Sequence, residues 1–107
     1  MPTTAAKFKI KSIVFACNRG ACVPDNSHKH TKGADIMVLI ADGTDIDLQF
    51  TNSPFQSGNT NIHIPKGTAV AEFVDTSIAS GTHFPYALTC TNPRCSTSNN
   101  PPEMIVD

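Results

Sequence analysis

The stretch TDIDLQF, residues 44–50, alternates apolar and polar side chains with a period of two. Ile46, Leu48 and Phe50 share one face, while two aspartates and a glutamine share the other. Successive side chains of a β-strand point to opposite faces of the sheet, so this pattern predicts a strand with one buried side and one wet side. The fold is therefore expected to contain a sheet with one face in the core.

The same alternation recurs along the chain. It is present in NIHI at 61–64, where His63 is expected to point outward, and in FPYALTC at 84–90. TAVAEFVD at 68–75 and EMIVD at 103–107 also read as strands. In the first strand the pattern changes register from KFKI to IVF, which predicts a bulge or a strand buried on both faces.

Turn signals separate these runs, and no window has the period of a long helix. ADG at 41–43 predicts a tight hairpin, with Gly43 free to adopt a positive φ. The longest segment without a strand pattern is NRGACVPDNSHKHTKG at 18–33, which we expect to be a loop. Frequent turns between short strands predict an all-β fold, a single Greek-key β-sandwich of about seven short strands.

Length and composition limit the function classes. The 107 residues suit one domain, so we expect residues 1–107 to fold as a single unit. Only 16% of residues are charged and the net charge is -1, which gives no basic surface for nucleic acid. No apolar run is long enough to span a bilayer, so membrane insertion is not expected.

The four cysteines form two pairs with equal spacing. Cys17 and Cys22 bracket four residues, and so do Cys90 and Cys95. An even number of cysteines in a small domain predicts two disulfides in an oxidising compartment, although three pairings remain open. We therefore expect a periplasmic or secreted location, with the signal peptide not present in this chain.

Residues 34–107 resemble the cupredoxin-like domain family. The resemblance is carried by IPKGTAVAEFVD at 64–75, PYALTC at 85–90 and PPEMIVD at 101–107. The first half is similar too, because ADIMVLIADGTDIDLQFTNSPF at 34–55 runs through a glycine turn into a strand that ends Asn-x-Pro-aromatic. The resemblance implies a cupredoxin-like sandwich in which Cys90 ends a late strand.

The departures from the family concern its copper ligands. A type 1 copper site needs two histidines, a cysteine and usually a weak axial methionine. Of these only Cys90 is in place, because Phe55 stands where the first histidine belongs, no histidine follows Cys90, and Met104 comes too late. We expect no copper centre and no other cofactor, and we expect Phe55 to fill the space of the missing ligand.

In this family the loops after strands one, three and seven lie at one pole, and the resemblance places all four cysteines there. The candidate partner-binding residues at this pole are Phe55, Asn92 and Arg94, next to a loop with His28 and His30. We expect the partner to be another protein or a larger assembly. The predicted function is that of a disulfide-stabilised binding or structural module without redox copper.

An alternative function is capture of a metal or electron transfer. His28 and His30 lie two residues apart, and with the thiolates of Cys90 and Cys95 they could bind copper or zinc. The four-residue cysteine spacers are longer than those of structural zinc knuckles, so no metal is expected. A thiol redox protein ranks below both. No nucleophile and base pairing has a readable context, so we expect no catalytic residues and no enzyme.

Overall fold

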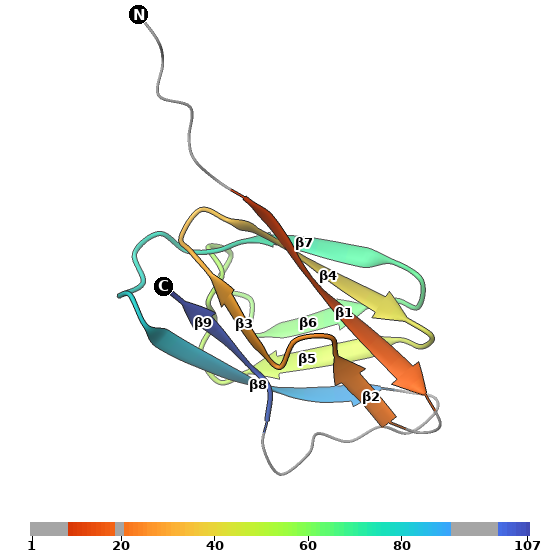
Figure 1. Ribbon diagram of the computed structural model, residues 1–107. Helices are drawn as coiled ribbons and strands as arrows, with labels where there is room; N and C mark the ends of the chain where they lie inside the picture. Colours follow the sequence, from red (N-terminus) through yellow and green to blue (C-terminus); the bar gives the residue numbers. More distant parts are fainter. Residues whose placement is uncertain (1–8, 19–20, 91–100) are drawn as a thin grey trace, which may run out of the picture.

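The computed structural model describes residues 9–18, 21–90 and 101–107, with the side chains of all of these except 17, 18, 21 and 22. This part of the chain folds into nine strands and contains no helix, so it has no helix able to cross a bilayer. The strands form two sheets that face each other as the layers of a sandwich (Figure 1). The prediction of an all-β fold is confirmed.

The first sheet has four strands, in the order β2 (Ala21–Pro24), β1 (Ile10–Asn18), β4 (Ile36–Asp42) and β7 (Ala69–Phe73). β1 and β2 form an antiparallel hairpin, whereas β1 runs parallel to β4. β7 lies antiparallel on the other side of β4 and is an edge strand of this sheet. β4 is therefore hydrogen-bonded on both sides.

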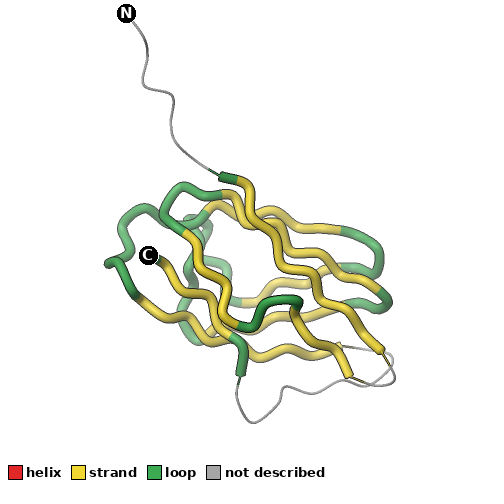
Figure 2. The backbone as a smooth tube through the Cα atoms, in the orientation of Figure 1, coloured by secondary structure: helices red, strands yellow, loops and turns green. Residues whose placement is uncertain are grey.

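The second sheet has five strands, in the order β3 (His28–Thr31), β9 (Glu103–Val106), β8 (Thr82–Cys90), β5 (Ile46–Phe50) and β6 (Asn61–Ile64). β3 runs parallel to β9, and the other neighbours are antiparallel. Figure 2 shows how the loops gather at the two ends of the strands. The C-terminal strand is thus an interior strand of its sheet.

The core lies between the two sheets. Ile46, Leu48 and Phe50 of β5 are at most 3% exposed, as their alternation predicts. Across the sandwich they face buried side chains of β1 and β4, among them Ile13 and Leu39. Burying large aliphatic and aromatic side chains provides most of the favourable free energy of such a fold.

Three sequence expectations are wrong, and two of them concern the first part of the chain. Residues 18–33 are not one loop, because β2 and β3 form within them. The first strand has no bulge against β4, since their register advances one residue at a time from Ile10 opposite Ile36 to Ala16 opposite Asp42. Hydrogen bonding to β9, far along the chain, makes a strand of HKHT at 28–31, whose own residues carry no strong apolar pattern.

The turn at ADG does not close a hairpin. Gly43 has a φ of 100°, as expected of a glycine in a tight turn. However, β4 and β5 belong to different sheets and do not pair, so the turn carries the chain across the sandwich. Turn composition signals the reversal of direction, but it does not determine whether the next strand pairs with the previous one.

Candidate functional site

Phe55 follows β5 and lies inside the molecule. Its side chain is 2% exposed, and its ring packs edge-to-face on Phe50 with centroids 5.5 Å apart. An isolated bridge to Val74 holds its backbone. The side chain therefore occupies the interior beside Phe50, and little of it is accessible to a partner. Contact of Phe55 with a partner stays a prediction.

The cysteines are only partly described. Cys90 ends β8, packs against the core and is bonded as a disulfide, so its thiol is not free. The backbones of Cys17 and Cys22 stand directly opposite each other in the β1–β2 hairpin. Cys95, like Asn92 and Arg94, falls outside the described residues. β2 also approaches β8, so both a local and a crossing partner for Cys90 remain open.

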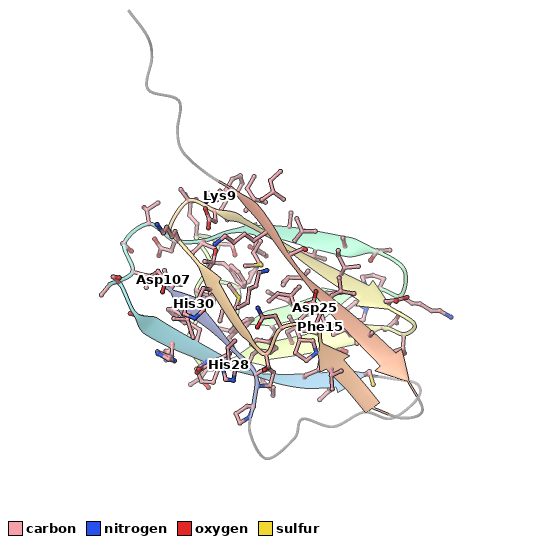
Figure 3. The ribbon with its side chains drawn as sticks, in the orientation of Figure 1. Lys9, Phe15, Asp25, His28, His30 and Asp107 are labelled. Atoms are coloured by element: carbon pink, nitrogen blue, oxygen red, sulfur yellow. The ribbon has the colours of Figure 1, made fainter. Side chains whose placement is uncertain are left out.

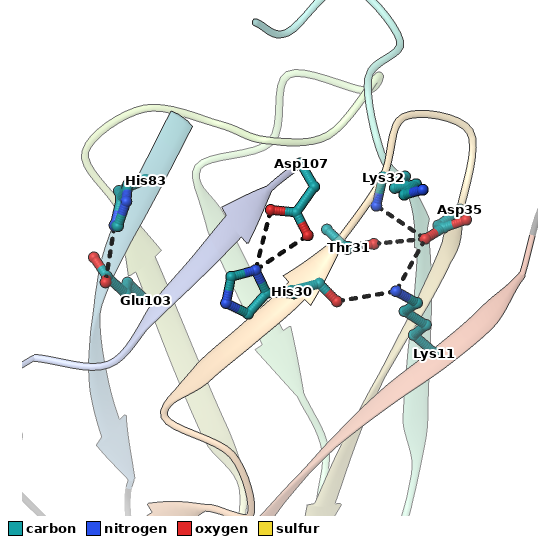
Figure 4. A network of polar contacts seen from close by, with 8 residues as sticks. All are labelled: Lys11, His30, Thr31, Lys32, Asp35, His83, Glu103 and Asp107. Atoms are coloured by element: carbon teal, nitrogen blue, oxygen red, sulfur yellow. Dashed lines mark hydrogen bonds and ion pairs between the residues drawn. The ribbon is translucent and has the colours of Figure 1, made fainter. Parts of the chain in front are cut away.

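His28 and His30 lie on strand β3 and not in a loop, as the sequence had suggested (Figure 3). Their side chains are on the outer face of the five-stranded sheet. Nδ1 of His28 lies 3.3 Å from Oε1 of Glu103, and Nδ1 of His83 lies 2.9 Å from the same oxygen. Nδ1 of His30 lies 3.1 Å from the Asp107 carboxylate (Figure 4). Three imidazoles and two carboxylates therefore share this face.

The hydrogen bond with His83, together with the electrostatic effect of that side chain and the contact with His28, lowers the pKa of Glu103, although burial opposes this shift. The two histidines thus stabilise the ionised form of Glu103. Among the residues that the structure describes, no group of three or more His, Cys, Asp or Glu side chains is placed to hold a metal ion.

Asp35 forms a polar cluster at one end of the sandwich. Its carboxylate accepts hydrogen bonds from the backbone N–H groups of Lys9 (3.1 Å) and Lys32 (2.9 Å) and from the hydroxyl of Thr31 (3.1 Å). Nζ of Lys11 lies 3.6 Å from Oδ2 (Figure 4). Burial favours a higher pKa for Asp35, but these bonds and the Lys11 charge outweigh it and lower the pKa.

The cluster ties the two sheets together. Nζ of Lys11, on β1, also donates a hydrogen bond of 3.1 Å to the carbonyl oxygen of His30, on β3. β1 and β3 lie in different sheets, so Lys11 and Asp35 connect the layers at their edge. Because Asp35 accepts three hydrogen bonds and its side chain is 4% exposed, we interpret the cluster as a structural contact between the layers.

The outer face of the four-stranded sheet is apolar across its width, and we call it the apolar face. Its residues are Ile10, Val14 and Ala16 on β1, Val23 on β2, Ile36, Val38 and Ile40 on β4, and Ala69, Ala71 and Phe73 on β7. Among the outward side chains of β1, β4 and β7 that the structure describes, the polar ones are Ser12 and Asp42. Ile10, Val23 and Phe73 are 69%, 60% and 56% exposed.

Sequence reasoning missed this face, although a signal exists. IMVLIA at 36–41 is a continuous apolar run without the alternation of β5, and such runs are typical of strands covered on both faces. In the sandwich only one face of β4 is covered by the second sheet. The role of Asp35 had no comparable signal, because Lys9 and Lys11 belong to a segment more than 20 residues earlier in the chain and only Thr31 and Lys32 are local partners.

Comparison of the chain with models of known protein families and with curated proteins finds no match.

Proposed function

We propose that this protein is a disulfide-stabilised, cupredoxin-like binding module that works outside the cytoplasm, without a type 1 copper centre and without catalytic activity. The single observation that carries this proposal is the burial of Phe55. At the strand end where the resembled family places its first copper histidine, a phenyl ring packs into the core beside Phe50. Position 55 therefore carries no imidazole that could serve as a copper ligand.

The strand arrangement supports the cupredoxin-like part of the proposal. β4 is followed by β5 in the opposite sheet, and β6 is followed by β7 in the first sheet again. Connections that cross between two packed sheets are characteristic of Greek-key sandwiches. Two mixed sheets with one parallel pair each fit such a topology.

The cysteines support a location in an oxidising compartment. Cys90 is disulfide-bonded, and a disulfide persists where thiols are not kept reduced. A second disulfide would use the remaining pair of cysteines. Each bridge contributes about 2–4 kcal/mol, which is a large part of the stability of a small domain.

Metal capture is the second candidate, and it has less support. It would use His28, His30, Cys90 and Cys95, but Cys90 is engaged in a disulfide and each of the two imidazoles contacts a carboxylate. A thiolate ligand would require reduction first. We therefore place binding of a partner ahead of binding of a metal ion.

Thiol counting together with a copper titration tests the proposal. Without reductant no thiol should react with an alkylating reagent, and after reduction and unfolding all four cysteines should react. Addition of Cu(II) should give none of the intense visible absorption of a copper–thiolate site. Four reactive thiols in the native protein, or a stoichiometric blue complex, would refute the proposal.

A further inference from the structure

Asp42 and Gly43 lie where the chain leaves the four-stranded sheet. Asp42 is the last residue of β4, and the chain crosses from there to β5 in the other sheet. This is the single Asp-Gly pair of the sequence, which contains no Asn-Gly pair. The Asp42 side chain is exposed, and Gly43, with a φ of 100°, has no Cβ beside its backbone nitrogen. The carboxyl group of Asp42 is therefore next to a backbone nitrogen that no side chain of the following residue shields.

Asp42 also differs from every other acidic residue in having no hydrogen-bond partner. All nine Asp and Glu residues lie in the described part of the chain. Each of the others has a carboxylate oxygen within 3.1 Å of a nitrogen or hydroxyl group, as Asp45 has with the backbone N–H of Lys66. The Asp42 carboxylate has neither a hydrogen bond nor an ion pair with any residue that the structure describes. The backbone nitrogen of Gly43 has no hydrogen-bond acceptor among these residues either.

We propose that Asp42 is a modification site, at which aspartate isomerises spontaneously to isoaspartate in the folded protein. The backbone nitrogen of Gly43 attacks Cγ of Asp42 and forms a five-membered succinimide ring. The carboxyl group loses one oxygen, which leaves as water together with the proton of the attacking nitrogen. This inference is independent of the proposed binding role.

Water then opens the ring at one of its two carbonyl carbons. Attack at Cγ breaks the Cγ–N bond and restores aspartate. Attack at the main-chain carbonyl carbon of Asp42 breaks its bond to the nitrogen of Gly43 and leaves isoaspartate. The water consumed in this step balances the water released in the first, so the reaction needs no other co-reactant.

The neighbouring aspartates are protected from the same reaction. Asp45 is followed by Ile46, whose branched side chain is buried and crowds the backbone nitrogen between the two residues. Asp35 is followed by Ile36, whose N–H group is donated to the carbonyl oxygen of Lys9 at 2.9 Å. Both carboxylates are also held by hydrogen bonds of their own. Isomerisation should therefore be confined to position 42.

Isoaspartate at position 42 would change the main chain at the crossing between the sheets. The chain would run through Cβ and be one carbon–carbon bond longer between β4 and β5. Both sides of this point are fixed, because Asp42 is paired with Ala16 in the β1–β4 ladder and the side chain of Thr44 is buried. The extra length has to be absorbed at Gly43 or by the strand ends, so the modified protein should have a lower Tm than the unmodified protein.

The test is to keep the folded, unreduced protein at neutral pH and body temperature for several weeks and to map isoaspartate by electron-transfer dissociation of its tryptic peptides. Trypsin releases residues 33–66 as one peptide, because no lysine or arginine lies between Lys32 and Lys66. Asp35, Asp45 and Asp47 are therefore internal controls within the same peptide. Isoaspartate should accumulate at position 42 and stay at the level of fresh protein at these three positions.

Two variants test the ring chemistry. Asp42→Glu keeps the charge but would have to close a six-membered ring, so the isomerised fraction at position 42 should fall at least tenfold. Asp42→Asn replaces the carboxylate by an uncharged amide that is more readily attacked, so the reaction at position 42 should become at least tenfold faster and release ammonia. Asp45→Asn is the matched control and should show no such gain. Circular dichroism of each fresh variant checks that the fold is kept.

Absence of isoaspartate at position 42 in the aged wild-type protein would overturn the inference. Equal amounts at positions 42, 45 and 47 would also overturn it, as would equal rates for Asp42→Asn and Asp45→Asn. The thiol and copper assays test the proposed function separately, so failure of one proposal is distinguishable from failure of the other.

Discussion

Replacement of Tyr86 by phenylalanine is predicted to stabilise the protein. Tyr86 is 2% exposed in the core, where its ring lies 5.0 Å from that of Phe50 and 6.1 Å from that of Phe15. Among the described residues its hydroxyl has no hydrogen-bond partner. Burial, with a smaller contribution from the negative charge of Asp25, raises the pKa of this hydroxyl, so it stays protonated and neutral.

The magnitude follows from the missing partner. A buried hydroxyl without a hydrogen bond costs about 1–3 kcal/mol relative to water. Removing one oxygen leaves a void of about 10–15 Å³, which costs about 0.3 kcal/mol at roughly 24 cal/mol per Å³. Tyr86→Phe should therefore raise the free energy of unfolding by about 1–2 kcal/mol, with a rise in Tm of about 4–8 °C per kcal/mol for a domain of this size.

The assay must be chosen with the composition in mind. The chain has one tyrosine and no tryptophan, so Tyr86→Phe removes the intrinsic fluorescence by which unfolding is commonly followed. Urea unfolding monitored by far-UV circular dichroism avoids this problem. Tyr86→Leu is the matched control, because it also removes the ring contacts and should lower stability by about 2–4 kcal/mol. A Tyr86→Phe protein less stable than wild type would show that the hydroxyl is hydrogen-bonded and would refute the reasoning.

Three further predictions concern the polar cluster, a close backbone contact and acid stability. Asp35→Ala should lower the free energy of unfolding by about 3–5 kcal/mol in urea titrations, because it removes the acceptor of the buried Thr31 hydroxyl and the counter-ion of the Lys11 ammonium. A loss below about 1 kcal/mol would contradict the role of the cluster. Gly33→Ala should lower the Tm, since a Cβ there would lie 2.9 Å from Cα of Thr76, and an unchanged Tm would show that this contact can relax. The pKa of Glu103 in the folded state is lowered from 4.5, so its contribution to stability is present above that value and is lost as the pH falls through the folded-state pKa. Glu103→Gln should therefore make the free energy of unfolding less dependent on pH in this acidic range. Identical pH profiles of stability for the wild type and the variant would argue against the effect.

The sequence was sufficient for the elements whose own residues carry a pattern. β5, β6 and β8 alternate strictly, and their buried residues are those expected from periodicity. β3 could not be predicted in this way, because HKHT contains no large apolar side chain and becomes a strand only beside β9. Short strands that depend on distant partners leave little trace in a local window.

The candidate site divides in the same way. Phe55 was expected to fill the space of a missing ligand, and its side chain is buried, whereas its expected contact with a partner stays a prediction. The apolar run at 36–41 shows that both faces of β4 are apolar. Predicting the apolar face from it would also require knowing that the second sheet covers only one side of β4. That information belongs to topology and not to the run itself.

The position of β9 has a consequence for how the protein is made. This strand lies between β3 and β8, yet its residues follow those of all the other described strands in the chain and leave the ribosome after them. Until they emerge, the nascent polypeptide has two open strand edges in its second sheet, and open edges are templates for misassociation. A premature stop before β9 would thus divide a sheet at its middle instead of removing an edge strand, and quality-control proteases should clear such fragments quickly.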